Sequence, residues 1–430
     1  MNQFINKEAS KIKSLIDQGF FHIFVGNILI KFISFFTSII IVRMISKENY
    51  AYFIYSNNLY AYITLFSGFG LATALLKYCS IRDDKGKNKA FLLFSLKYGV
   101  LAQLILSSLI LVYIHYFEVP FPEAKSLVSL MFLTPTMSYV VEVIQNFVRA
   151  NGKNKLYSFI AVIQTVSILI FTITFVYFYN VYGIPLATYL AFLVSILIGF
   201  SFIKKEYGKS EKKSIDKNIK KAFIMMGISL MIANFFSMIL PINELTIISS
   251  LIKDEIVTAN YKVGVMIPSQ IGFITGSAMI FYFPILAKMR NNSEIINLAL
   301  KIQFYIGLVV LVVSLIGFIL SPFIINYLYG NEYYDSVKIQ RIFWIVNAIN
   351  AGFRMIPLNI MPALGRVRFN ALISIFTAIV HLFLSYIFIS RFGIDGAAYS
   401  LIIVYTFSGI ISWYYLIRLT KNSNTANIIN

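Results

Sequence analysis

The sequence predicts an all-α integral membrane protein with about twelve transmembrane helices, arranged as two pseudo-symmetric six-helix bundles. Three observations predict this fold: the composition, the length of the apolar runs, and a repeat between the two halves of the chain. Hydrophobic residues make up 58% of the 430 residues and charged residues 13%, with a mean hydropathy of +0.76. A soluble domain carries roughly 25% charged residues, and its core could not hide this much apolar surface.

Apolar runs that can cross a bilayer recur along the whole chain, since a helical span takes about 20 residues. We expect them near residues 22–45, 50–78, 91–116, 126–148, 156–179, 183–203, 222–250, 256–286, 301–320, 339–361, 369–389 and 394–417. The lysine-bearing segment Met1–Gly19 is amphipathic and is expected to lie along the membrane surface. It lacks a short apolar core followed by small residues, so no cleaved signal peptide is expected.

A charged segment in the middle of the chain, KKEYGKSEKKSIDKNIKK (204–221), holds eight lysines and three acids. Burying unpaired ions of this kind would cost several kcal/mol each, so the segment must lie in solvent. We expect it to be a basic cytoplasmic linker between an N-terminal six-helix half (1–203) and a C-terminal six-helix half (222–430).

The distribution of lysine and arginine predicts the orientation. If the N-terminus lies inside, twenty-six of these residues fall on the inner side and seven on the outer side. Positive residues accumulate in cytoplasmic loops, so both termini and the linker are expected in the cytoplasm. The net charge of +19 follows from the same bias, and nucleic acid is not an expected partner.

A repeat appears where the halves are compared. ANGKNKLY (150–157) and ALGRVRFN (363–370) each have Ala-x-Gly, a cation, one residue and a second cation. Some thirty residues later, YGIPLATY (182–189) is expected to match FGIDGAAY (392–399). Two such bundles related by a pseudo-two-fold axis are typical of transporters, which build a central site with two access routes.

Ionisable residues at membrane depth are expensive and are therefore candidates for function. The cations are Lys31 in the first span, Lys262 near the start of the eighth and Arg354 near the middle of the tenth. Lys262 has an alternative, because its long side chain could reach the outer interface. The acids are Glu142 in the fourth span and Glu244 in the seventh.

Each acid has a functional and a structural interpretation. Glu142 and Arg354 fall at nearly matching places in the two halves, so they could pair across a cavity as an ordinary ion pair. Glu142 could instead titrate with the proton gradient. Glu244 lies one turn after Pro241, where a kink and a freed carbonyl would create a polar spot, which suggests a gating or coupling-ion role.

Three motifs resemble one family. IVRMISKENYAYFIYSNNLYAYITLFSGFGLATALLKY (41–78) has Arg43, an S-x-E-x-Y turn, Gly68-x-Gly70 and Lys77. LYGNEYYDS (328–336) is expected between the ninth and tenth helices, and the Gly-x-x-Lys/Arg elements begin at Gly152 and Gly365. Together they resemble the polysaccharide-type flippases of the multidrug/oligosaccharidyl-lipid/polysaccharide (MOP) exporter superfamily, closest to the Wzx-type O-antigen flippases. Ala51 departs from the family, which often has glycine there.

The resemblance implies a MATE-like fold and a flippase for an undecaprenyl-pyrophosphate-linked oligosaccharide, the O-antigen repeat unit of lipopolysaccharide, in the bacterial inner membrane. Its implied partners are this lipid-linked substrate, membrane lipid, H⁺ or Na⁺ as coupling ion, and the glycan polymerase machinery. Lys31, Lys262 and Arg354 would then bind the pyrophosphate, because lysine and arginine both suit phosphate.

Two other functions fit the sequence less well. A multidrug or cation antiporter of the same superfamily should have an acid-rich site, whereas candidate cations outnumber acids here. A membrane-embedded glycan polymerase or ligase usually has a large external loop, and the longest one expected here is Ser321–Val337. The chain has no Walker A, G-x-S-x-G or zinc motif and only three histidines and Cys79, so no enzyme activity, cofactor, metal or internal disulfide is expected.

Overall fold

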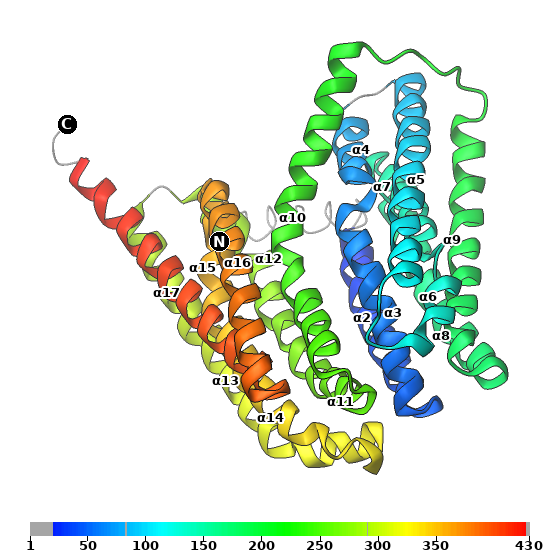
Figure 1. Ribbon diagram of the computed structural model, residues 1–430. Helices are drawn as coiled ribbons and strands as arrows, with labels where there is room; N and C mark the ends of the chain where they lie inside the picture. The colour runs from blue at the N-terminus through cyan, green and yellow to red at the C-terminus, as the bar shows by residue number, and fades with distance from the viewer. Residues whose placement is uncertain (1–19, 82–83, 290, 427–430) are drawn as a thin grey trace. The chain divides into compact units, whose positions relative to one another are not determined.

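The computed structural model describes residues 20–81, 84–289 and 291–426, which are mostly helical and contain no strand (Figure 1). The expected surface helix Met1–Gly19 lies outside these residues. Within them, ten helical segments are long and apolar enough to cross a membrane. One of the ten, Asn154–Tyr207, holds two successive helices, and residues 336–363 form a further helical run. The prediction of an all-α membrane protein with about twelve spans is confirmed.

The chain folds into two compact units, Met1–Phe235 and Phe236–Asn430. The N-terminal unit contains α2 (Phe20–Met44), α3 (Lys47–Phe66), η1 (Ser67–Gly70), α4 (Leu71–Ser80), α5 (Lys85–Tyr116), η2 (Pro122–Ala124), α6 (Lys125–Leu130), α7 (Thr134–Ala150), α8 (Asn154–Tyr179), η3 (Asn180–Tyr182) and α9 (Gly183–Tyr207). The C-terminal unit contains α11 (Glu255–Met266), η4 (Pro268–Ile271), α12 (Gly272–Lys288), α13 (Asn292–Tyr329), η5 (Asn331–Tyr333), α14 (Ser336–Ile349), η6 (Asn350–Arg354), α15 (Met355–Ala363), α16 (Val367–Phe392) and α17 (Ile394–Ala426). The boundary falls inside α10 (Lys217–Ile252), so the first part of this helix packs with the N-terminal unit.

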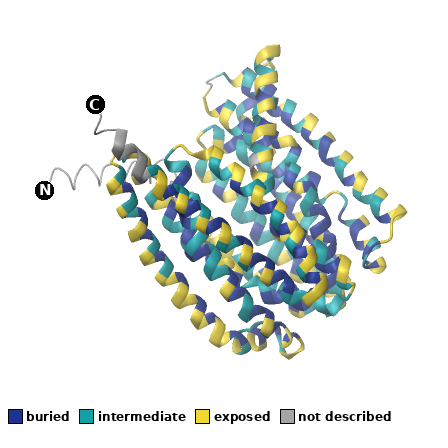
Figure 2. Cartoon of the chain, turned by 60° about the vertical axis from the view of Figure 1, so that its left-hand side comes forward, coloured by how far each residue is buried: buried dark blue, intermediate teal, exposed yellow. Residues whose placement is uncertain are grey.

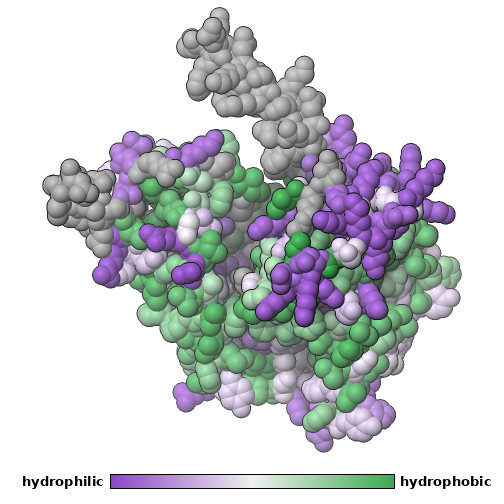
Figure 3. Space-filling model, turned by 90° about the horizontal axis from the view of Figure 1, so that it is seen from above, coloured by the Kyte–Doolittle hydropathy of each residue, from purple (hydrophilic) through white to green (hydrophobic). Residues whose placement is uncertain are grey.

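Each unit has its own apolar core and an apolar outer surface. Buried residues include Leu75 and Phe147 in the N-terminal unit and Trp344 and Ile360 in the C-terminal unit. Exposed faces of the outer helices are also apolar, and lipid is a suitable solvent for them (Figure 2). Hydrophilic side chains gather instead over the end of the N-terminal unit that carries the linker (Figure 3).

The repeat is visible in the backbone of the two units. α8 and α16 are both 26 residues long, and each begins just after a glycine with positive φ, Gly152 at 72° and Gly365 at 75°. The residues that cap the two helices at their C-terminal ends, Asn180 (φ 52°, ψ −139°) and Gly393 (φ 59°, ψ −143°), also share one conformation. These four positions have one common offset between the units, so the first pair of repeat motifs is aligned correctly.

The second pair of motifs was aligned three residues out of register. At the common offset Gly183 matches Gly396, whereas the sequence comparison paired it with Gly393. The contacts support the structural match, because a Cβ on Gly183 would lie 2.2 Å from the Phe175 carbonyl oxygen and one on Gly396 would lie 2.1 Å from that of Phe388. Glycine is needed at both places so that the sixth and twelfth spans can turn back closely against the spans before them.

The expected external loop Ser321–Val337 was too long, because α13 continues through Pro322 to Tyr329. A proline inside a helix frees the carbonyl four residues earlier. Here Arg341 Nε donates to that freed Phe318 carbonyl at 3.4 Å, and the guanidinium lies 5.5 Å from the Phe318 ring centre. The helix therefore survives the proline, and only a short connection with η5 separates α13 from α14.

Hydrogen bonds and an ion pair hold the first part of the basic linker against the start of α5. The Lys89 ammonium donates to three backbone carbonyls around the end of α9, those of Tyr207, Gly208 and Ser210, at 3.0, 3.4 and 2.8 Å. Lys213 Nζ lies 3.1 Å from Asp84 Oδ2. The linker is thus solvent-exposed, as its charge predicts, but specific contacts hold its first part in place.

We expect acid to release this part of the linker. Asp84 bonds to Lys213 and to the backbone N–H groups of Lys87 and Gly86, and these contacts lower its pKa. Because the folded-state pKa is lowered, the stabilisation is complete above the unfolded pKa of about 3.9 and is lost as the pH falls through the folded value. Hydrogen exchange in residues 208–216, corrected for intrinsic rate, should therefore rise in acid, and in Asp84→Asn at neutral pH.

Glu211→Gln is the matched control, because it removes one exposed carboxylate of the linker itself and leaves Asp84 in place. Equal exchange in Asp84→Asn and Glu211→Gln would contradict the assignment of Asp84 as the anchor.

Candidate functional site

The tenth span is interrupted at its centre by a π-helical turn, η6, between α14 and α15. A π turn and the nearby Pro357 leave backbone carbonyls without helical partners, and in an apolar interior these carbonyls need other donors. Side chains from α12, α13 and α17 supply them: Thr275 donates to Ala351 O at 2.8 Å, Gln303 to Gly352 O at 2.6 Å and Trp413 to Phe353 O at 3.2 Å. Three helices therefore fix the position of this turn.

Removing one of these donors should destabilise the protein measurably. Gln303→Leu leaves the Gly352 carbonyl without its donor, which typically costs about 1–3 kcal/mol when the group is buried. The expected result is a lower melting temperature of the purified protein in detergent. Gln340→Leu is the matched control, because Gln340 is fully buried and its amide has no hydrogen-bond partner among the described residues. Equal losses in both variants would contradict the role of Gln303.

Arg354 is the last residue of the π turn and is held in one orientation. Its Nε donates to Ser408 Oγ at 2.8 Å, its Nη1 donates to Asn350 Oδ1 at 3.0 Å, and the guanidinium lies 4.8 Å from the ring centre of Tyr405. In the described part of the chain these bonds use two of the five N–H donors. The unused edge of the guanidinium can bind a planar or tetrahedral anion through parallel hydrogen bonds.

A second polar group, centred on Glu244 of α10, lies in the same unit. The Tyr261 hydroxyl and the Lys262 ammonium, both of α11, lie close enough to the Glu244 carboxylate to interact with it electrostatically. Tyr405 interacts electrostatically with both the Glu244 carboxylate and the Arg354 guanidinium. The structure therefore places three of the five predicted residues, Glu244, Lys262 and Arg354, in the C-terminal unit, where electrostatic interactions with Tyr405 and with one another link them into one polar network.

His381 of α16 extends this network. It is fully buried, its ring nitrogen lies 3.0 Å from Ser385 Oγ, and Ser385 Oγ lies 2.9 Å from Ser400 Oγ. His381 also interacts electrostatically with Arg354. Among the described residues, no group of three His, Cys, Asp or Glu side chains is placed to hold a metal ion.

Glu142 belongs to the N-terminal unit and lies at a break in the second span. η1 separates α3 from α4 there, with positive φ at Gly68, Phe69 and Gly70. Ser67 Oγ donates to Glu142 Oε2 at 2.5 Å. The carboxylate of the fourth span is thus hydrogen-bonded to the irregular turn of the second span.

Lys31 belongs to the N-terminal unit. Its side chain is exposed on α2, and Ser158 of α8 packs against the same helix at Gly26. Glu142 and Arg354 lie in different units, each with hydrogen-bond partners of its own. A direct pair between them stays a prediction.

Sequence reasoning missed the residues that orient Arg354. Asn350, Ser408 and Tyr405 are ordinary polar and aromatic residues of apolar helices, and α17 lies some fifty residues downstream. Asn350 alone carried a signal, because it precedes Arg354 by four residues and so lies on the same helical face. No comparable signal marked the others.

Comparison with known proteins gives the family. A model of the family described as "Polysaccharide biosynthesis protein" matches residues 16–290. A putative O-antigen transporter of Shigella flexneri is 26% identical over 212 residues, which cover 48% of this chain and 49% of that protein. An uncharacterized membrane protein of Methanocaldococcus jannaschii is 22% identical over 423 residues, which cover 91% of this chain and 82% of that protein. The chain therefore spans about half the length of the Shigella relative.

Solved structures show the same fold. The inward-facing conformation of a multidrug resistance MATE family transporter of the MOP superfamily matches with a TM-score of 0.68 at 14% identity, covering 91% of this chain and 95% of that one. A MOP superfamily transporter from Pyrococcus furiosus matches with a TM-score of 0.62 at 14% identity, covering 95% and 96%. These matches confirm the MATE-like fold, and both solved neighbours, like the Shigella relative, are described as transporters. The chain belongs to the polysaccharide biosynthesis protein family, as the resemblance to Wzx-type flippases of the MOP superfamily predicted.

Proposed function

We propose that the protein is a flippase that moves an undecaprenyl-pyrophosphate-linked oligosaccharide, an O-antigen repeat unit, from the cytoplasmic to the periplasmic leaflet of the bacterial inner membrane by alternating access. Membership of the polysaccharide biosynthesis family supports a glycan pathway, and the name of the Shigella relative supports O antigen. Solved neighbours with this fold have inward-facing and outward-facing conformations, which supports alternating access. The lysine and arginine bias supports cytoplasmic termini.

The single observation that carries the proposal is the guanidinium of Arg354. It lies on an interrupted membrane helix and is oriented by Asn350, Ser408 and Tyr405, with one edge unused. Placing a charged arginine within a membrane span costs free energy, so an arginine that is retained there is a candidate for function. Pyrophosphate is the charged part of the proposed substrate, and the arginine fork matches its oxygens.

The other predicted residues have subordinate roles in this proposal. Lys262 supplies a second positive charge in the same network, and Lys31 supplies one from α2. Glu244 balances Lys262 between transport events, and Glu142 or Glu244 takes up the coupling ion, H⁺ or Na⁺. The glycan polymerase machinery would then receive the product outside.

The coupling role is tested by replacing each acid with its amide. Glu244→Gln keeps the shape of the side chain but cannot exchange a proton. We expect transport in proteoliposomes to lose its response to an imposed pH gradient in Glu244→Gln or in Glu142→Gln. Glu294→Gln, in the exposed first turn of α13, should keep it. An unchanged gradient response in both membrane variants would remove proton coupling from the proposal.

The function itself is tested in a strain that lacks the gene. Mass spectrometry of polyprenyl-linked glycans should show accumulated repeat units, and staining should show loss of surface polysaccharide. Both changes should be reversed by the wild-type gene. Normal glycan pools in the deletion strain would contradict the proposal and would favour a drug or cation antiporter.

A further inference from the structure

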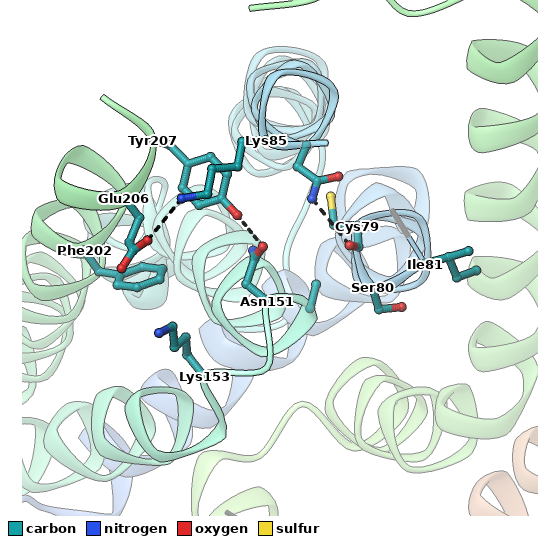
Figure 4. Close-up of a pocket in the computed structure, with 11 residues that line it drawn as sticks. Cys79, Ser80, Ile81, Lys85, Asn151, Lys153, Phe202, Glu206 and Tyr207 are labelled. Atoms are coloured by element: carbon teal, nitrogen blue, oxygen red, sulfur yellow. Dashed lines mark hydrogen bonds and ion pairs between the residues drawn. The ribbon is translucent and has the colours of Figure 1, made fainter. Parts of the chain in front are cut away.

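A cavity of about 390 Å³ lies in the N-terminal unit, where α9 leads into the linker (Figure 4). Its size falls within the range of ligand pockets, roughly 300–1,000 Å³. The ends of α4, α5, α7, α8 and α9 surround it. Its polar lining consists mainly of Lys85, Asn88, Asn151, Lys153, Glu206 and Tyr207. None of these residues belongs to the polar network around Arg354.

The inner wall of this cavity is fixed by hydrogen bonds. The Tyr207 hydroxyl donates to Asn151 Oδ1, and Asn151 Nδ2 donates to the Phe147 carbonyl at 2.7 Å. On the other side, Asn88 Nδ2 donates to the Cys79 carbonyl at 3.5 Å. A pocket whose wall is already ordered binds a ligand without the entropic cost of ordering these side chains.

The charges around the cavity favour an anion. Lys85 Nζ lies 3.6 Å from Glu206 Oε2, and an ion pair this exposed is worth little. Lys153 is exposed and has no ion-pair partner in residues 20–81, 84–289 and 291–426. Lys153 is also the N-cap residue of α8, where no side chain caps the helix, so the positive end of the helix dipole adds to its charge.

The position of the cavity along the membrane normal indicates which anions reach it. Five membrane helices begin or end around it, so it lies where the bilayer places its head groups. The lining also includes the apolar side chains of Phe202 and Ile81, which can contact the acyl or prenyl chains that follow a head group. A soluble anion needs no such apolar surface.

We propose that this cavity binds the phosphate of a lipid head group. Two sources share this chemistry: the phosphodiester of an anionic lipid such as phosphatidylglycerol, and the pyrophosphate of a polyprenyl carrier. Lys85 and Lys153 bind the phosphate oxygens, and the Asn151–Tyr207 wall limits the depth of entry. Only the second source rests on the proposed function, as a docking place for the substrate before transport.

The test is thermal unfolding of the full-length protein in detergent, titrated with phosphatidylglycerol, phosphatidylcholine or sodium pyrophosphate. A ligand that binds the folded state raises the melting temperature by an amount that grows with the logarithm of its concentration relative to its Kd. We expect stabilisation by phosphatidylglycerol, by pyrophosphate or by both, and none by phosphatidylcholine. In the variant Lys85→Ala/Lys153→Ala, the apparent affinity should fall by about tenfold or more, since each lysine contributes a charged hydrogen bond.

The matched control is Lys204→Ala/Lys205→Ala, which removes the same charge from exposed positions at the end of α9 that do not line the cavity. It should bind as the wild type does. The single variant Lys153→Gln, at an exposed position, replaces the double variant if that protein is unstable without ligand, and it should show the same direction of change.

The ligands that bind assign the source. Binding of phosphatidylglycerol alone assigns the site to membrane lipid, and binding of pyrophosphate alone assigns it to the carrier. The absence of stabilisation by either, or equal losses in the cavity variant and its control, would overturn the proposal. Arg354 is intact in both the cavity variant and its control, so the comparison of these two variants tests the cavity alone, and the proposed function stands or falls separately on transport by Arg354→Ala.

Discussion

Arg354→Ala is expected to reduce transport of the lipid-linked oligosaccharide on the order of 100-fold, because a charged hydrogen bond to a bound anion is worth about 1.5–3 kcal/mol and two such bonds would be lost. The remaining network would also change, since Asn350 and Ser408 lose their charged partner. The measurement is the amount of surface polysaccharide in the deletion strain complemented with the variant, normalised to protein in the membrane fraction.

Two variants separate the shape of the side chain from its charge. Arg354→Lys keeps the positive charge but has no planar fork, so we expect partial activity, between that of the wild type and Arg354→Ala. Arg391→Ala removes an arginine from the exposed end of α16 and should leave transport unchanged. Full activity of Arg354→Ala at normal abundance would show that the guanidinium is not part of the substrate path.

Gly70→Ala is expected to lower the stability of the N-terminal unit by a few kcal/mol. Gly70 has φ +71°, a conformation that costs an L-residue about 1–2 kcal/mol, and its added Cβ would lie 2.1 Å from the Gly227 carbonyl oxygen. A backbone atom cannot move aside as a side chain can, so α10 would have to shift from the break between α3 and α4, at a cost typical of overpacking, about 1–3 kcal/mol. The measurement is the melting temperature of the detergent-purified protein.

Gly276→Ala is the control for this substitution. Gly276 lies in α12, and among the described residues no heavy atom outside its own stretch of helix lies within 4 Å of where its Cβ would be. Alanine there should be neutral or stabilising, because it favours the helix by about 1 kcal/mol over glycine. Equal melting temperatures for Gly70→Ala and Gly276→Ala would show that the close approach of α10 at Gly227 is not required.

The helices could be predicted from the sequence because, in lipid, the backbone N–H and C=O groups must form their hydrogen bonds within the protein, and few structures allow this. Every apolar run of sufficient length had to be a helix, and the described part of the chain agrees. The breaks inside the spans could not be predicted in this way. η1 and η6 lie within runs whose hydrophobicity is continuous, and η6 depends on donors such as Gln303 and Trp413 that come from distant helices.

The repeat shows a similar limit. Sequence identity alone aligns Gly183 with Gly393. The structure aligns it with Gly396, because Gly183 packs against Phe175 in the same way as Gly396 packs against Phe388. The choice between two neighbouring glycines depends on which one faces the preceding helix, and spacing alone does not contain that information. In the same way, the charge of Arg354 was evident from the sequence, but the side chains that orient it were not.

The central claim is that Arg354 lies on the path of an anionic lipid-linked glycan. The most direct measurement is translocation in proteoliposomes that contain the purified full-length protein and a labelled polyprenyl-pyrophosphate oligosaccharide, followed by a glycosidase that reaches only the outer leaflet. We predict that wild-type protein exposes the inner-leaflet label to the enzyme and that Arg354→Ala does not, at equal reconstitution. Equal rates for wild type, Arg354→Ala and protein-free liposomes would contradict the flippase, and equal rates for wild type and Arg354→Ala above liposomes alone would contradict the site.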